Sequence, residues 1–118
     1  MKLEDFLVYK KAFDLASDLT VVSKTFPEDE KDSLVFQLIR SSKAVYVILE
    51  EAYKKKKNEK LFINKLNDAN NENTESRSWL RFAGSCRYIS SDVYNDFLSK
   101  NLEVEKLIKS LIKNPKKI

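Results

Sequence analysis

The sequence predicts an all-α fold, an antiparallel up-down-up-down four-helix bundle. The 118 residues include one glycine and two prolines, far fewer turn residues than a β fold requires. Apolar residues recur every three to four positions along four segments, which is the spacing of one buried helix face. The connections between these segments are short, and short connections favour antiparallel neighbours.

Length and composition fit a single domain over residues 1–118. A chain of this size buries roughly two-thirds of its unfolded surface, so it can hold a core without disulfides or metals. The 42% of apolar residues provide that core, and the 34% of charged residues suit solvated outer faces. Cys86 is the only cysteine, the N-terminus lacks the apolar run of a secretory signal, and nothing is apolar enough to span a membrane. We therefore expect a cytoplasmic protein without membrane contact.

The first two helices are expected over residues 3–24 and 28–57. The buried stripe of the first consists of Leu7 or Val8, Ala12, Leu15, Ala16, Leu19 and Val22. Pro27 separates the two helices, because it disfavours the α conformation at Phe26. The buried stripe of the second consists of Leu34, Leu38, Ser41 or Ser42, Val45, Leu49 and Ala52.

The last two helices are expected over residues 58–82 and 91–113. The stripe of the third consists of Phe62, Leu66, Ala69, Asn73, Ser76, Leu80 and Ala83. The middle of this segment is rich in asparagine, a poor helix former, so tertiary packing must stabilise it. Gly84-Ser85 is the predicted helix stop, and Ser90 or Ser91 is the predicted N-cap of the fourth helix. The apolar face of the fourth consists of Val93, Phe97, Leu98, Leu102, Val104, Leu107, Ile108, Leu111 and Ile112.

Several short segments resemble those of a known family in their order and spacing. They are Val8-Tyr9-Lys10-Lys11-Ala12, Phe26-Pro27-Glu28-Asp29-Glu30 with Leu34, Gln37, Leu38 and Arg40, then Glu51, Phe62, Glu72, Glu75, Trp79-Leu80 and Tyr88-Ile89. The chain resembles the "four helix bundle protein" family, also called the 23S rRNA intervening-sequence protein family, over about residues 6–90. Residues 44–52 depart from the family's S-I-P-x-N-I-A-E-G segment, and Ile39 replaces the first of its paired arginines. The resemblance is therefore that of a divergent member.

The resemblance implies a four-helix protomer that often assembles as a homopentamer and has no established enzymatic activity. Some members lie in sequences that interrupt ribosomal RNA genes. Related proteins serve as accessory factors to the reverse transcriptases of diversity-generating elements, with a basic surface that can engage nucleic acid. These associations suggest a context without assigning this chain a role.

Side chains for catalysis are scarce. The chain has no histidine, so the commonest general base and metal ligand is missing, and Cys86 has no histidine to activate it. The carboxylates of Glu72 and Glu75 lie three residues apart, but bundle metal sites usually include a Glu-x-x-His motif. We predict no catalytic site, no metal and no cofactor, and a Cys86 that fills space in or near the core. Glu72 or Glu75 is expected to pair with Arg40, Arg77 or Arg81.

Basic residues suggest a nucleic-acid surface. The net charge is +4, with −3 over residues 1–32 and +7 over the remainder. Basic side chains can neutralise phosphates, and an aromatic residue such as Trp79 can stack on bases. The alternatives are a solvated face, with Trp79 as a core or interface residue, and a lysine content inherited from an AT-rich genome. The candidate nucleic-acid-binding residues are Lys54, Lys55, Lys56, Lys57, Arg77, Arg81 and Arg87.

Apolar residues outside the four stripes exceed what a lone bundle can bury, and apolar surface in quantity usually marks an interface. The candidate interface residues are Phe36, Ile39, Tyr46, Ile48 and Trp79. We therefore predict a non-enzymatic bundle that assembles with itself, as a closed ring and by resemblance as a pentamer, and that binds RNA or DNA through its basic surface. The alternatives are a protein-binding adaptor and a metal-dependent enzyme that processes nucleic acid.

Overall fold

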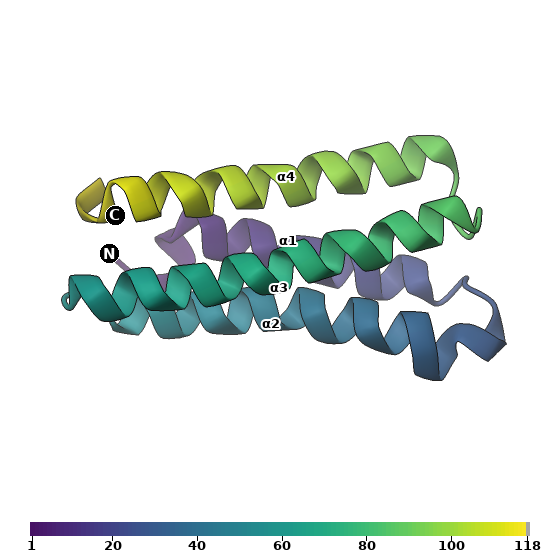
Figure 1. Ribbon diagram of the computed structural model, residues 1–118, viewed down its shortest axis with the longest axis horizontal. Helices are drawn as coiled ribbons and strands as arrows, with labels where there is room; N and C mark the ends of the chain where they lie inside the picture. Colours follow the sequence, from purple (N-terminus) through teal and green to yellow (C-terminus); the bar gives the residue numbers. More distant parts are fainter. Residues whose placement is uncertain (118) are drawn as a thin grey trace.

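The computed structural model, which describes residues 1–117, contains four helices packed side by side (Figure 1). Their bounds are α1 Leu7–Ser23, α2 Phe36–Lys54, α3 Glu59–Ser85 and α4 Ser91–Lys113. Each helix packs antiparallel to the next, and α4 also contacts α1, which closes the bundle. No strand occurs among residues 1–117, so the predicted fold class is confirmed. Ile118, the last residue of the predicted domain, lies outside the described residues.

The core is formed by the residues that recur at helical spacing. All seven stripe residues predicted for α3 are buried, although that helix is rich in asparagine. The predicted stripe of α2 is buried as well, including both Ser41 and Ser42. Of the two alternatives predicted for the first position of the α1 stripe, Val8 is buried, with 2% exposed, whereas Leu7 is 55% exposed. Tertiary packing thus compensates for the weak helix propensity of α3.

The start of the second helical segment differs from the prediction. Residues Glu28–Glu30 form a 3-10 turn, Lys31–Val35 form a π-helical segment, and regular α geometry begins only at Phe36. Tyr88 contacts the chain just before this π-helical segment, because its hydroxyl donates a 2.8 Å hydrogen bond to Glu30 and its ring lies 5.6 Å from that of Phe26. This hydrogen bond, together with the loss of solvent contact, raises the pKa of Tyr88 to about 12. The prediction of one continuous helix from residue 28 to 57 is therefore wrong at its start.

The other predicted ends need smaller corrections. A 3-10 turn at Leu3–Asp5 precedes α1, which begins at Leu7 rather than residue 3. At its other end, α2 stops at Lys54 rather than residue 57, and α3 begins at Glu59, where the Asn58 side chain accepts a hydrogen bond from the backbone of Leu61. The predicted N-cap of α4 is confirmed, because Ser90 Oγ accepts a 3.2 Å hydrogen bond from the Val93 N–H.

Gly84, near the end of α3, does not have the helix-ending role that glycine often has. Helix α3 continues through Gly84 and Ser85, and the left-handed residue beyond its end is Arg87, with φ of 61°. The backbone N–H groups of Arg87 and Tyr88 donate to the carbonyls of Gly84 and Ala83, both at 3.0 Å, which is a Schellman cap. Gly84 is needed for close packing instead, because a Cβ there would lie 2.8 Å from Tyr94 Cδ1. The helix thus ends at Ser85, within the predicted stop Gly84-Ser85 but three residues beyond the predicted bound at residue 82, and Arg87 rather than the glycine is the left-handed residue.

We predict that Arg87→Gly stabilises the protein by about 0.5–1 kcal/mol, because glycine removes the steric cost of a left-handed residue while adding some chain entropy to the unfolded state. Thermal unfolding followed by circular dichroism measures the effect. Arg87→Ala is the control, since it removes the charge and keeps the strained backbone. An equal gain for both variants would show that charge, and not backbone conformation, is responsible.

Candidate functional site

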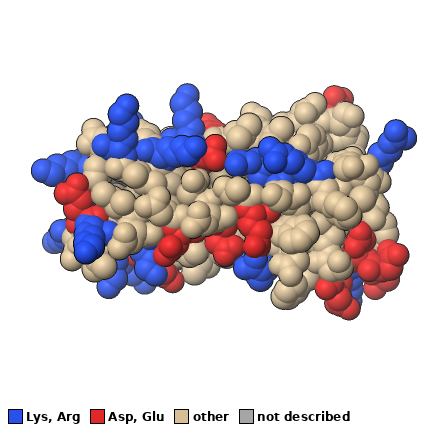
Figure 2. Space-filling view, viewed as in Figure 1, with Lys and Arg blue, Asp and Glu red and all other residues tan. Residues whose placement is uncertain are grey.

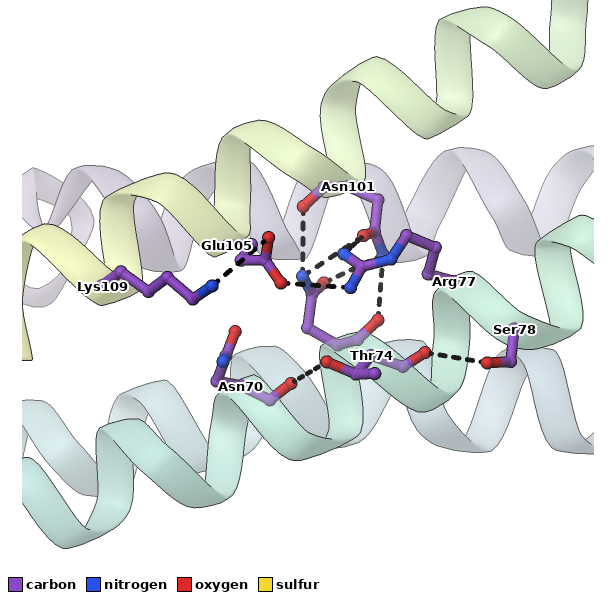
Figure 3. Close-up of polar contacts among 8 residues, drawn as sticks. Asn70, Thr74, Arg77, Ser78, Asn101, Glu105 and Lys109 are labelled. Carbon is purple, nitrogen blue, oxygen red and sulfur yellow. Dashed lines mark hydrogen bonds and ion pairs between the residues drawn. The ribbon is translucent and has the colours of Figure 1, made fainter.

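A buried polar cluster joins α3 to α4 (Figure 3). Asn73 and Asn101 are each 1% exposed. Each carboxamide donates a 3.1 Å hydrogen bond to the backbone carbonyl of the other residue, and Asn101 Nδ2 also donates to Asn73 Oδ1 at 3.1 Å. This reciprocal pairing satisfies both amides, and it is possible only when the two residues lie opposite each other.

Arg77 extends this cluster. Its guanidinium donates to Asn101 Oδ1 at 2.9 Å and to Glu105 Oε1 at 3.1 Å, and its side chain is only 11% exposed. Lys109 approaches Glu105 at 3.8 Å from the next turn of α4. Arg77 is thus bound within the protomer, and it does not lie with the exposed basic residues. The sequence interpretation missed Asn101, although its position between Phe97 and Val104 has the spacing of the buried stripe.

A second set of ion pairs joins α2 to α3. The Arg40 guanidinium lies 3.5 Å from Glu72 and also binds Glu75. The predicted pairing of these carboxylates with an arginine is therefore confirmed. Lys65 and Glu51 form a similar bridge of 2.9 Å between the same helices. These pairs neutralise Glu51, Glu72 and Glu75 within the protomer.

Lys54–Lys57 lie where α2 ends and the chain turns into α3. Lys54 pairs with Glu50 at 3.3 Å, and Lys56 Nζ lies 4.1 Å from the centre of the Tyr53 ring. Together with Tyr53 and Asn58, the four lysines line a shallow, open hollow of about 490 Å³. This hollow is the most concentrated positive feature that the predicted residues form.

The C-terminal lysines lie at the same end of the bundle. The turn Pro115–Lys117 contacts α3, and the Tyr53 hydroxyl binds the carbonyl of Met1, so both segments lie at the end of the bundle where α2 is connected to α3 (Figure 1). We call residues 54–60 and 113–117 together the basic end. Residues 54–60 include five lysines and one glutamate, and residues 113–117 include three lysines and no acidic residue. In Figure 2, much of the lysine and arginine surface lies on this side, and acidic side chains gather at the opposite lower corner.

The predicted nucleic-acid-binding residues therefore do not form one site. Lys54–Lys57 lie together at the basic end, whereas Arg87 is exposed in the α3–α4 turn at the other end of the bundle. Arg81 is exposed near that turn and lines a hollow with Tyr94. The sequence interpretation left Lys113, Lys116 and Lys117 out of the site. Topology could have added them, because an up-down-up-down bundle places its C-terminus beside the second connection.

An aromatic cluster lies between α1 and α2. The Phe13 and Tyr46 rings are 5.0 Å apart in an edge-to-face arrangement, and Tyr9 lies 6.1 Å from Tyr46. Phe13 is exposed and the two tyrosines are half-buried. Among the predicted interface residues, Phe36 is 55% exposed. The others, which are half-buried, are Ile39, Tyr46, Ile48 and Trp79.

Other features restrict the chemistry available to the described residues. Among residues 1–117, no three Cys, Asp or Glu side chains converge as a metal site would require. Cys86 is exposed at the end of α3, so the prediction that it fills space in or near the core is wrong. None of the helices formed by residues 1–117 is long and apolar enough to cross a membrane.

Comparison with known proteins identifies the family. A family model described as "23S rRNA-intervening sequence protein" matches residues 4–110, which is most of the chain. The chain belongs to the 23S rRNA-intervening sequence protein family. A similar solved structure is that of a protein of unknown function from the S23 ribosomal protein family of Bacteroides thetaiotaomicron VPI-5482. It is 28% identical to this family member, with a TM-score of 0.82 and coverage of 91% of this chain and 99% of that one.

No curated protein matches this member of the family. The family is one of unknown function, and so is the similar solved structure. The family match and the similarity to this solved structure confirm the family resemblance that the sequence indicated. The charge and shape of this chain itself therefore indicate which residues carry its function.

Proposed function

We propose that this family member is a non-enzymatic, self-assembling bundle protein of the cytoplasm that binds RNA or DNA through its basic surface. The observation that carries the proposal is the basic end, where lysines from two segments distant in sequence lie at one end of the bundle. Phosphates are the ligands that such a cluster attracts most strongly in a cell, because each neutralised phosphate releases a bound counterion.

Assembly is supported by apolar surface that the protomer leaves in contact with water. Phe36, Val47 and Phe82 are each about half exposed, and Phe13 adds an exposed aromatic ring on the α1–α2 side. Residues of this kind in such number are typical of surfaces that another subunit covers. The family resemblance supports a homopentamer, which would bury these residues in a closed ring.

The non-enzymatic part of the proposal is supported by the state of the polar groups. The carboxylates of Glu72, Glu75 and Glu105 are all bound to arginine. The chain has no histidine, the side chain that most often transfers protons in enzymes at neutral pH. A protein-binding adaptor is the second candidate, and the exposed Phe13 ring, which packs edge-to-face on Tyr46, favours it.

We predict that the protein elutes as an oligomer, with a mass of about five times 13.8 kDa for a pentamer. Phe36→Asp should shift the measured mass toward that of a single chain, because a charge at this position would oppose burial in a subunit interface. The same aspartate is compatible with the fold of the protomer, since an acidic residue is favourable in the first turn of a helix. Size-exclusion chromatography with light scattering at micromolar concentration is the measurement. Val21→Asp, at an exposed position of α1 outside the predicted interface, is the matched control. A wild-type protein that runs only at 13.8 kDa would refute self-assembly.

We also predict that nucleic-acid binding weakens steeply with salt. If six or more phosphates are contacted, the affinity should fall by about 10³ between 50 and 200 mM salt, because counterion release dominates such binding. Fluorescence anisotropy with a labelled RNA duplex measures this dependence. Absence of binding at 50 mM salt would remove the nucleic-acid part of the proposal and leave the adaptor as the better candidate.

A further inference from the structure

The charge of this protein is divided along the axis of the bundle. The basic end has eight lysines and one glutamate within residues 54–60 and 113–117. At the other end, residues 28–32 in the α1–α2 connection include four acidic residues and one lysine. A polyanion that approaches the molecule is therefore attracted to one end and repelled from a corner of the other.

We propose that the basic end binds the phosphate backbone of a double-helical nucleic acid without reading its bases, with the α2–α3 connection and the C-terminal segment acting as one site. This inference rests on the proposed function and deepens it, because it names the surface and the kind of nucleic acid. It leaves Arg77, Arg81 and Arg87 outside the site.

Four lysines of the basic end are free to bind phosphate. Along the body of the bundle, many basic residues are neutralised by nearby carboxylates; these include Lys10, Lys11, Arg40, Lys65, Arg77, Lys100 and Lys109. By contrast, within the part of the chain that the structure describes, no carboxylate lies within 4.0 Å of Lys55, Lys57, Lys113 or Lys116. All four are exposed, so a phosphate would not have to displace an internal ion pair.

The chemistry of the cluster favours phosphate over base edges. All of its cations are lysines, which bind phosphate as point charges. Specific reading of base edges depends mostly on arginine, asparagine and glutamine side chains that form paired hydrogen bonds. Arg77, which has that geometry, donates instead to Asn101 and Glu105. Binding at this end should therefore be nearly independent of sequence.

The aromatic residues near the basic end are not available to stack on unpaired bases. The Tyr53 ring lies 5.6 Å from the Phe6 ring, has Lys56 above it, and holds Met1 through its hydroxyl. Phe6 and Phe62 are buried in the core. Proteins that prefer single strands use exposed aromatic platforms. This end lacks one among the described residues, so a double helix with its regular phosphates is the better ligand.

The dimensions agree with this ligand. The bundle measures 44 × 25 × 21 Å, so its end is about as wide as it is deep. A duplex carries one phosphate charge for roughly every 1.7 Å of its axis, and the end therefore spans the charge of about a dozen phosphates. Lysines from both segments can then contact one duplex together.

The test compares two variants of equal charge by fluorescence anisotropy. One carries Lys55→Gln, Lys57→Gln, Lys113→Gln and Lys116→Gln, and the control carries Lys24→Gln, Lys31→Gln, Arg81→Gln and Arg87→Gln at the opposite end. The basic-end variant should bind an RNA duplex of about 25 base pairs at least 30-fold more weakly at 50 mM salt, with its salt slope reduced by about 3.6. The control should stay within about threefold of wild type. Circular dichroism verifies that both variants fold.

Three further probes decide between outcomes. A duplex of scrambled sequence should bind with the same affinity as the original RNA duplex. A single strand of that duplex should bind with lower affinity than the duplex. Tighter binding of the single strand, strong dependence on sequence, or equal losses in the two variants would overturn this inference while the proposed function stands. If wild type binds no nucleic acid but adheres to vesicles of anionic phospholipid, the inference and the nucleic-acid function both fail.

Discussion

The reciprocal hydrogen bonds between Asn73 and Asn101 set how α4 docks on α3. The other buried contacts of these helices are largely apolar, and apolar contacts tolerate sliding far better than a pair of buried amides does. A shift of α4 by one turn, about 5.4 Å, would break the reciprocal hydrogen bonds between the two carboxamides and the hydrogen bond from Arg77 to Asn101. The cost of unpaired buried polar groups therefore selects one register of the two helices.

The position of the basic end follows from that register. Lys113 lies about three turns beyond Asn101 on α4, and the basic α2–α3 connection lies about four turns before Asn73 on α3. With the two asparagines opposite each other, the segments meet at one end of the bundle (Figure 1). At the other end, Tyr88 holds the acidic α1–α2 connection through Glu30. The Asn73–Asn101 and Tyr88–Glu30 contacts thus help to hold the basic segments and the acidic α1–α2 connection at opposite ends of the bundle.

Much of this arrangement could be predicted from sequence, because burial imposes a helical spacing that the stripe of α3 shows clearly. Asn101 was missed because a polar amide within an apolar stripe is expected to lie outside the core unless its buried partner is known. The left-handed cap at Arg87 was missed because Gly84 suggested an earlier end, and only the Tyr94 ring explains that glycine. The π-helical segment before α2 and the long-range contact of Glu30 with Tyr88 were missed because no local sequence pattern reveals either.

The most direct test is a double-mutant cycle with Asn73→Leu and Asn101→Leu, measured by urea unfolding. We predict that each single change destabilises the protein by about 2–3 kcal/mol, since it leaves buried polar groups unpaired. The double variant should lose at least about 1 kcal/mol less than the sum of the two. Asn95→Leu, at an exposed position on α4, is the control and should change little. Small and additive losses would contradict the view that this pair sets the register of the bundle.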